Sequence, residues 1–454
     1  MTVEGLTINS LKKKDLLTLG FMMFSIYFGA GNLIFPPALG QAAGDHTLHA
    51  MLGFMTTGIG LPLLGITAIA LAGGEYVPLL HAKTWPRFAT VLLVILYLII
   101  GPLFAMPRTG AVSFEIGIRP FLSADNLALG QIIYTAIFFA SSYYLALNPN
   151  KIIDRVGRML TPALLIVLLI LFVQAFHAPL GAILPATGAY IDAPFAQGFQ
   201  DGYQTMDLLA SIAIGALVAN AVRMRGITDS RAVGAACLVS GLITVMLMAA
   251  VYGSLAYIGA TSTSVLGQAE NGGQILSAAV GIFFGSAGNL LLAVIIGLAC
   301  LTTCCGITSS AAMFFNKLLK GRVSYERLLL FSILFSFAAS NVGLTQIIAL
   351  AIPFLVTIYP LIIVFVILSL FDRFIGWRKS IYQGAMALTL VFSLIDGLHA
   401  AGLSSEPVHA LLVAYIPFYN IMMGWVCPAV IGALVGLIIS FFQTAPAAAK
   451  ESQV

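Results

Sequence analysis

Long apolar stretches recur along the whole chain, and short polar segments separate them. A helix needs about 20 apolar residues to cross the hydrocarbon core of a bilayer. The pattern therefore predicts an all-α integral membrane protein with twelve transmembrane helices. The expected spans are 16–39, 49–74, 87–110, 128–147, 159–177, 198–222, 232–258, 285–315, 325–341, 344–370, 380–400 and 411–442.

The composition supports a membrane protein. The 454 residues are 60% hydrophobic and only 8% charged, whereas soluble domains have about 25% charged residues. The net charge of +4 is spread over loops, so it does not indicate nucleic-acid binding. All five cysteines lie in apolar segments, and we interpret them as small buried residues rather than disulfides or metal ligands; they are Cys237, Cys300, Cys304, Cys305 and Cys427.

The basic residues predict the orientation of the spans. Lysines and arginines follow the even-numbered spans, and the loops 40–48, 178–197, 259–284, 342–343 and 401–410 contain none. Only Arg108 and Arg119 depart from this pattern. By the positive-inside rule, both termini are expected in the cytoplasm, as tails 1–15 and 443–454. No small-residue cleavage site follows Lys12–Lys14, so we expect the first span to be uncleaved.

The first span contains glycines and prolines between Phe28 and Pro37. Both residue types destabilise helix interiors, and freed backbone groups find no water in lipid. Secondary transporters use such broken helices to bind substrate and ions near mid-membrane. Gly29–Asn32 lies about 21 Å along a helix from the cytoplasmic end, and a half-helix starting near Leu33 would attract an anion such as a carboxylate. A simple packing kink is the alternative interpretation.

The sixth span contains Asp207 near mid-membrane and only Gly202 as a helix breaker. An intramembrane carboxylate is costly unless it has a partner. Asp207 could bind a cation or proton, pair with a substrate ammonium, or form a structural contact between helices. The eighth span carries Thr302 and Thr303, whose hydroxyls suit a small alkali cation. From spacing alone, bonds to the preceding turn or contacts between helices are the favoured interpretation.

Two charges near the end of span 3, Arg108 and Glu115, share one helical face about 10 Å apart. We predict gate or structural roles for them rather than substrate binding; either the helix bends to pair them or each has another partner. Gly432 and Gly436 would permit close helix packing. No phosphate-binding loop or His-Glu-x-x-His pair is present in the sequence, so we predict a transporter driven by an ion gradient, not an enzyme.

Several motifs resemble the bacterial branched-chain amino acid:cation symporter family. They are Phe28–Pro37, Gly101–Pro102 through Pro107–Thr109, Asn148–Lys151 through Leu160–Pro162, Gly202–Asp207, Thr302–Thr303 with Gly306–Ser309, and Ile358–Pro360. The resemblance implies symport of leucine, isoleucine or valine with Na⁺, or with H⁺, across the bacterial inner membrane. It also implies a LeuT-type fold of two inverted five-helix repeats, 16–177 and 198–370, plus two further helices in 380–442, with spans 1 and 6 broken.

The resemblance also implies two sites. The substrate carboxylate would bind at Gly29, Ala30, Gly31 and Asn32, and we add Thr205 and Asp207 as further candidate substrate-binding residues. Sodium would bind the carbonyls of Ser25 and Phe28 together with Ala299, Thr302 and Thr303, which reverses the interpretation from spacing. Besides the coupling ion we expect no cofactor and no nucleic-acid partner, and we expect a monomer in the lipid bilayer, with a dimer as the alternative. The alternatives are an H⁺-coupled symporter of another small neutral amino acid or a nucleobase and, from a different class, a passive channel.

Overall fold

The computed structural model describes residues 12–442 apart from 75, 148, 228, 377 and 405. These residues form helices and no strands, as predicted. The tails before residue 12 and after residue 442 lie outside the described residues, as do the side chains of Lys151, Arg155 and Arg158.

Nineteen α-helices follow one another along the described chain. They are α1 (Lys13–Tyr27), α2 (Ala30–Ala43), α3 (Thr47–Met55), α4 (Leu61–Leu71), α5 (Tyr76–Lys83), α6 (Pro86–Leu98), α7 (Ala105–Gly117), α8 (Leu127–Ala146), α9 (Pro149–His177), α10 (Pro194–Asp201), α11 (Asp207–Arg223), α12 (Ser230–Leu266), α13 (Gly272–Leu318), α14 (Tyr325–Ser340), α15 (Leu344–Leu370), α16 (Asp372–Ile375), α17 (Lys379–Ala400), α18 (Glu406–Tyr415) and α19 (Val426–Phe442). Short 3₁₀ or π segments connect several of them: η2 (Gly44–His46), η3 (Thr56–Gly60), η4 (Ile99–Leu103), η5 (Arg119–Phe121), η6 (Ala124–Asn126), η7 (Gly188–Tyr190), η8 (Gly202–Thr205) and η9 (Tyr419–Ile421).

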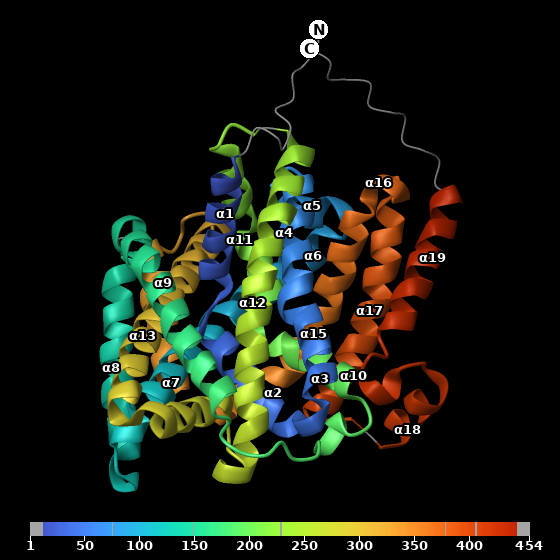
Figure 1. The fold of residues 1–454 in the computed structure, drawn as a ribbon. Helices are drawn as coiled ribbons and strands as arrows, with labels where there is room; N and C mark the ends of the chain where they lie inside the picture. The colour runs from blue at the N-terminus through green and yellow to red at the C-terminus, as the bar shows by residue number, and fades with distance from the viewer. Residues whose placement is uncertain are drawn as a thin grey trace.

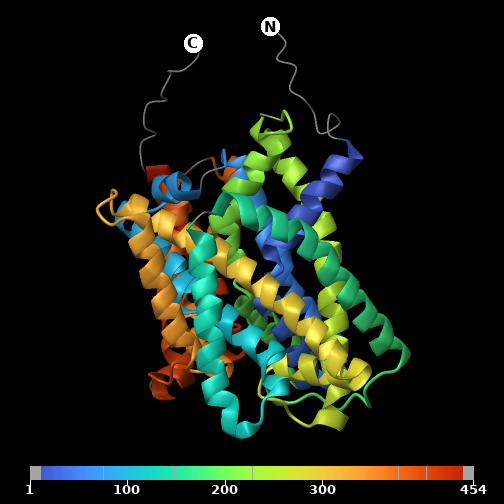
Figure 2. The ribbon, with the colours of Figure 1, turned by 90° about the vertical axis from the view of Figure 1, so that its left-hand side faces the viewer.

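The long helices form one bundle, seen from two sides in Figures 1 and 2. Helix α1 begins and α19 ends at the same end of this bundle, the upper end in Figure 1, where α5 and α16 also lie. The described chain therefore starts and finishes on one side. Which side faces the cytoplasm stays a prediction from the basic residues.

The structure confirms the helical class but not the predicted number of spans. In the described part, seven helical segments are long and apolar enough to cross a membrane, and a bent pair, Pro194–Thr205 with Asp207–Arg223, would make an eighth. Two shorter apolar helices, Pro162–His177 and Val426–Phe442, fall below that length. The count of twelve is thus not confirmed, and the division into repeats 16–177 and 198–370 stays a prediction.

Helix α2 is fixed in the bundle by close backbone contacts. A Cβ atom at Gly40 would lie 1.9 Å from the carbonyl oxygen of Ala256 in α12, and one at Gly259 would lie 2.0 Å from that of Pro37. At the start of α13, a Cβ at Gly272 would lie 1.7 Å from the carbonyl oxygen of Ile34. Only glycine allows these helices to approach so closely, so α2 is held on two sides.

Helix α13 is longer than the predicted eighth span and is broken. It starts at Gly272, and Gly285 interrupts it with φ +65° and ψ −160°. The interval 259–284, predicted as a loop, is therefore mostly helical, because α12 continues to Leu266 and the first part of α13 is a helical arm. This arm lies across the lower end of the bundle in Figure 1.

Gly432 and Gly436 pack within the chain, as their spacing allowed. A Cβ at Gly432 would lie 2.3 Å from the carbonyl oxygen of Gly384 in α17, and one at Gly436 would lie 2.2 Å from that of Ser380. This small-residue motif therefore joins α19 to α17.

Candidate functional site

The first break separates α1 from α2 at Phe28 and Gly29, whose backbones are extended. The Phe28 N–H still closes α1 by donating to the Phe24 carbonyl, at 2.8 Å. The Asn32 side chain accepts the Gly29 N–H at 3.2 Å and so caps α2. The break was predicted, but the second half-helix starts at Ala30 rather than near Leu33, because this cap allows Ala30, Gly31 and Asn32 to form its first turn.

The second break separates α10 and η8 from α11, with a bend of 48°. Its pivot is Met206, a non-glycine residue with φ +63°, so Gly202 is not the breaking residue that the sequence indicated. The Thr205 hydroxyl donates to the Gly202 carbonyl at 2.9 Å and accepts the Asp207 N–H at 3.3 Å. Thr205 thus holds the shape of this break, and Asp207 opens α11.

A hydrogen bond joins the two breaks. Asn32 Nδ2 donates to Asp207 Oδ2 at 2.7 Å, and it also contacts the hydroxyl of Tyr252 in α12. The Tyr252 hydroxyl donates to the same carboxylate oxygen at 3.4 Å. All three side chains are buried, with at most 4% of their surface exposed. The substrate-binding candidates of spans 1 and 6 therefore meet in one place.

Arg108 of α7 lies beside both breaks. Its guanidinium donates to the carbonyls of Gln204 and, at 3.4 Å, Thr205. It also lies 5.2 Å from the centre of the Phe35 ring, and a Cβ at Gly31 would be 2.8 Å from its Nη2 atom. Arg108 is 5% exposed. We predicted a gate or structural role for Arg108, and the structure places it next to the candidate substrate-binding residues.

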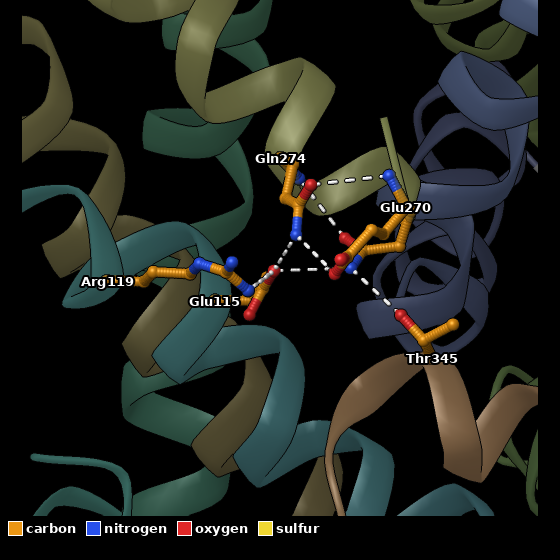
Figure 3. Close-up of polar contacts among 6 residues, drawn as sticks. Glu115, Arg119, Glu270, Gln274 and Thr345 are labelled. Carbon is orange, nitrogen blue, oxygen red and sulfur yellow. Dashed lines mark hydrogen bonds and ion pairs between the residues drawn. The ribbon is translucent and has the colours of Figure 1, made fainter. Parts of the chain in front are cut away.

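Glu115 does not pair with Arg108; it has other partners at the opposite end of α7. Its Oε1 atom accepts from Arg119 at 2.7 Å, Gln274 at 2.9 Å and Asn271 at 3.2 Å. Figure 3 shows this network, in which Asn271 also reaches Thr345 of α15 at 3.4 Å. The second of the two sequence-based alternatives is therefore correct, and Glu115 ties the arm of α13 to α7.

The candidate sodium residues are brought partly together. A Cβ at Gly29 would lie 3.4 Å from Cγ2 and 3.7 Å from Oγ1 of Thr303, so Thr303 lies beside the first break. The Thr302 hydroxyl donates to the Ala299 carbonyl at 2.9 Å, the local bond that spacing favoured. Ser25 and Phe28 lie in the last turn and C-cap of α1. The described residues contain no cluster of three acidic, histidine or cysteine side chains for a metal; an alkali cation would depend on hydroxyls and carbonyls.

The sequence analysis did not identify Tyr252, and it did not predict that Arg108 lies beside the candidate substrate residues. Tyr252 is one hydroxyl inside a long apolar helix, and nothing in its neighbourhood along the chain relates it to Asp207. Arg108 did carry a signal, because an ionisable residue inside a span is by default a functional candidate. Its position depends on a bend at η4, just before α7, where Gly101 adopts non-helical angles of φ −100° and ψ −125°.

Structures and sequences of known proteins agree with this architecture. A solved structure of Mhp1, a nucleobase-cation-symport-1 family transporter in a closed conformation, matches with a TM-score of 0.58 over 94% of this chain and 92% of that chain, at 14% identity. The match shows that this chain shares that fold, the LeuT type. The sequence matches the family described as branched-chain amino acid transport protein over residues 12–443. The chain belongs to that family.

Curated relatives match along nearly their whole length. The branched-chain amino acid permease BraB of Bacillus subtilis (strain 168) is 46% identical over 96% of this chain and 97% of its own. The branched-chain amino acid transport system 2 carrier protein of Pseudomonas aeruginosa is 44% identical, with 94% and 96% covered. The permease BrnQ of Escherichia coli (strain K12) is 38% identical, with 95% and 96% covered. The protein is therefore a transporter rather than an enzyme, and an integral protein of the inner membrane.

Proposed function

We propose that this protein carries leucine, isoleucine or valine into the cell together with Na⁺. The observation that carries the proposal is the hydrogen bond from Asn32 to Asp207, which joins two helix breaks inside the membrane bundle. Discontinuous helices of this kind form the substrate and ion sites of secondary transporters. The names of the relatives supply the substrate class.

The substrate carboxylate binds at the first turn of α2. The first N–H groups of a helix have no partner within it and carry partial positive charge. Ala30, Gly31 and Asn32 provide these groups, and the absence of a side chain at Gly31 lets the Arg108 guanidinium lie against them. From the second break, Asp207 contacts this turn through its hydrogen bond from Asn32, and Thr205 accepts the Asp207 N–H.

The coupling ion binds between the end of α1 and α13. Na⁺ takes oxygen ligands, and the carbonyls of Ser25, Phe28 and Ala299 with the hydroxyls of Thr302 and Thr303 supply that chemistry. The position of Thr303 beside Gly29 supports this assignment. Because both sites share one helix break, filling the ion site stabilises the backbone geometry that the substrate needs. Movement of one group of helices against the other would then expose the sites alternately to each side.

Uptake by purified protein in liposomes tests the proposal. We expect labelled leucine to accumulate against its gradient when Na⁺ is high outside, and to stop accumulating when the Na⁺ gradient is collapsed. Accumulation driven equally well by a pH gradient without Na⁺ would assign the coupling to protons. Competition with unlabelled leucine, serine and uracil separates the substrate classes, and a passive channel would give equilibration without accumulation.

A further inference from the structure

Two buried charges of opposite sign flank the first turn of α2. Arg108 lies against Gly31, and Asp207 is hydrogen bonded to the next residue, Asn32. Arg108 and Asp207 are 5% and 4% exposed, yet they form no ion pair within 4.0 Å among the described residues. Opposite charges in an apolar interior normally pair directly. Here Arg108 binds carbonyls of the second break, and Asp207 accepts a hydrogen bond from Asn32 beside the first break. The positive and the negative group therefore stay apart; we call them the positive and the negative pole.

The region around Arg108 also has unused hydrogen-bonding capacity. A guanidinium has five N–H donors, and two of those of Arg108 bind backbone carbonyls. Its buried Nε atom has no partner in the described structure, and neither does the buried Oε1 atom of Gln204, whose carbonyl receives Arg108. Leaving such buried groups unsatisfied costs about 1–3 kcal/mol each. The free Nε–H of Arg108 is a buried donor that a substrate carboxylate would satisfy.

We propose that Arg108 and Asp207 form a clamp for the two charges of an amino acid: the substrate carboxylate bridges the α2 N-terminus and the Arg108 guanidinium, and the ammonium binds the Asp207 carboxylate. This proposal rests on the proposed function and adds Arg108 as a determinant of substrate class. A zwitterion adds one charge to each pole and leaves the site neutral. An amine or a keto acid leaves one pole unpaired and adds a net charge to a dry site, which is strongly disfavoured.

Analogues that lack one charge test the clamp in the unmodified protein. Isopentylamine has the leucine side chain and an ammonium but no carboxylate, and 4-methyl-2-oxopentanoate has the carboxylate but no ammonium. We expect both to compete with labelled leucine at least about 100-fold more weakly than leucine itself, because sites that depend on a polar group reject analogues without it. If wild-type protein accumulates leucine but either analogue competes as well as leucine, the clamp is overturned while the transport function stands. If leucine is not accumulated at all, the proposed function fails instead.

Two substitutions test which residue binds the substrate carboxylate and which binds the ammonium. In Arg108→Gln we expect leucine binding to weaken at least about tenfold while binding of isopentylamine is unchanged or stronger, since the charge that repels the amine is removed. In Asp207→Asn we expect the reverse preference, toward the oxo acid. A merely structural role for either residue would weaken all three ligands equally, so a constant ratio between them contradicts the proposal.

Matched controls keep the test independent of folding. Arg119→Gln removes a guanidinium that follows the end of α7 and pairs with Glu115. Asp201→Asn removes a carboxylate at the end of α10, in the same broken span as Asp207, where it accepts from Tyr190. Both should keep the wild-type ligand ratios. If Arg108→Gln does not fold, Arg108→Lys can replace it, because lysine retains the positive charge but lacks the planar set of N–H donors of a guanidinium. It should bind leucine more weakly than wild type and still reject the amine; acceptance of the amine by this variant contradicts the clamp.

Discussion

The guanidinium of Arg108 occupies the space where a side chain of Gly31 would be. A Cβ atom at Gly31 would lie 2.8 Å from Nη2 and 3.1 Å from Cζ of Arg108. Both residues are buried, so neither can move into solvent. Helix α2 and the arginine of α7 therefore fix each other's position, and the size of residue 31 controls whether they can do so.

Gly31→Ala should impair leucine uptake much more than Gly29→Ala. Forcing a methyl group into a packed site costs about 1–3 kcal/mol, and 1.4 kcal/mol corresponds to about tenfold in affinity. At Gly29 the added Cβ would meet Thr303 at 3.4 Å, an ordinary contact, and the extended backbone there accepts alanine. Concentration-dependent uptake of the two variants measures the difference. Equal impairment would show that Arg108 can move aside without loss.

Asn32→Ala should reduce transport more than Tyr252→Phe. Asn32 donates to Asp207 at 2.7 Å and accepts the Gly29 N–H, so its loss leaves a buried carboxylate and a backbone donor short of a partner. Hydrogen bonds to charged groups contribute about 1.5–3 kcal/mol. Tyr252→Phe removes the longer bond of 3.4 Å to Asp207 and the contact of the hydroxyl with Asn32, but it retains the ring and leaves the bond between Asn32 and Asp207 in place. Initial uptake rates at saturating and limiting leucine compare the variants, and a greater loss in Tyr252→Phe would make the tyrosine the principal partner of Asp207.

Thr303→Ala should raise the Na⁺ concentration needed for half-maximal uptake, because it removes one proposed hydroxyl ligand beside the first break. Thr308→Ala is the matched control. Thr308 lies on the same helix, is fully buried, and donates to the Cys304 carbonyl at 2.6 Å. Leucine uptake measured over a range of Na⁺ concentrations should shift for Thr303→Ala only. An unchanged Na⁺ dependence in that variant would place the ion elsewhere.

The network of Figure 3 should depend on Glu115 more than on Arg119. Glu115→Ala removes one acceptor from each of the amides of Asn271 and Gln274, which keep Thr345 and Glu270, respectively, and each lost hydrogen bond contributes about 0.5–1.5 kcal/mol. Arg119 is 37% exposed in its side chain, and exposed ion pairs contribute about 0–1 kcal/mol. The melting temperature in detergent should therefore fall further in Glu115→Ala than in Arg119→Ala. An equal fall in the two variants would mean that the hydrogen bonds of Glu115 to Asn271 and Gln274 add nothing to its ion pair with Arg119.

The sequence was enough to predict the helical membrane class and the first break, because apolar length and glycine with proline each have one dominant physical explanation. The burial of Asp207 between the two breaks agrees with its selection as a candidate, while its role stays a prediction. The pivot at Met206 could not be predicted. A left-handed methionine is unfavourable on its own, and only surrounding contacts such as those of Thr205 maintain it. The contact between Arg108 and Gly31 likewise depends on how helices far apart in the chain pack together.

Lys83 and Asp372 form a buried ion pair that should tolerate joint replacement better than the loss of one partner. Lys83 Nζ lies 2.8 Å from Asp372 Oδ1, with side chains 3% and 9% exposed, and the Tyr382 hydroxyl donates to the same oxygen at 2.9 Å. Removing one member of a buried pair costs about 3–5 kcal/mol because the other charge stays unpaired, whereas replacing both by apolar residues is often neutral. Lys83→Met should therefore melt at a lower temperature than wild type, and the double variant Lys83→Met with Asp372→Leu should recover most of that loss. Since the pair lies away from the helix breaks, the affinity for leucine should be unchanged in the double variant. A double variant that melts no higher than Lys83→Met would show that Asp372 stabilises this end of the bundle through Tyr382 rather than through the lysine.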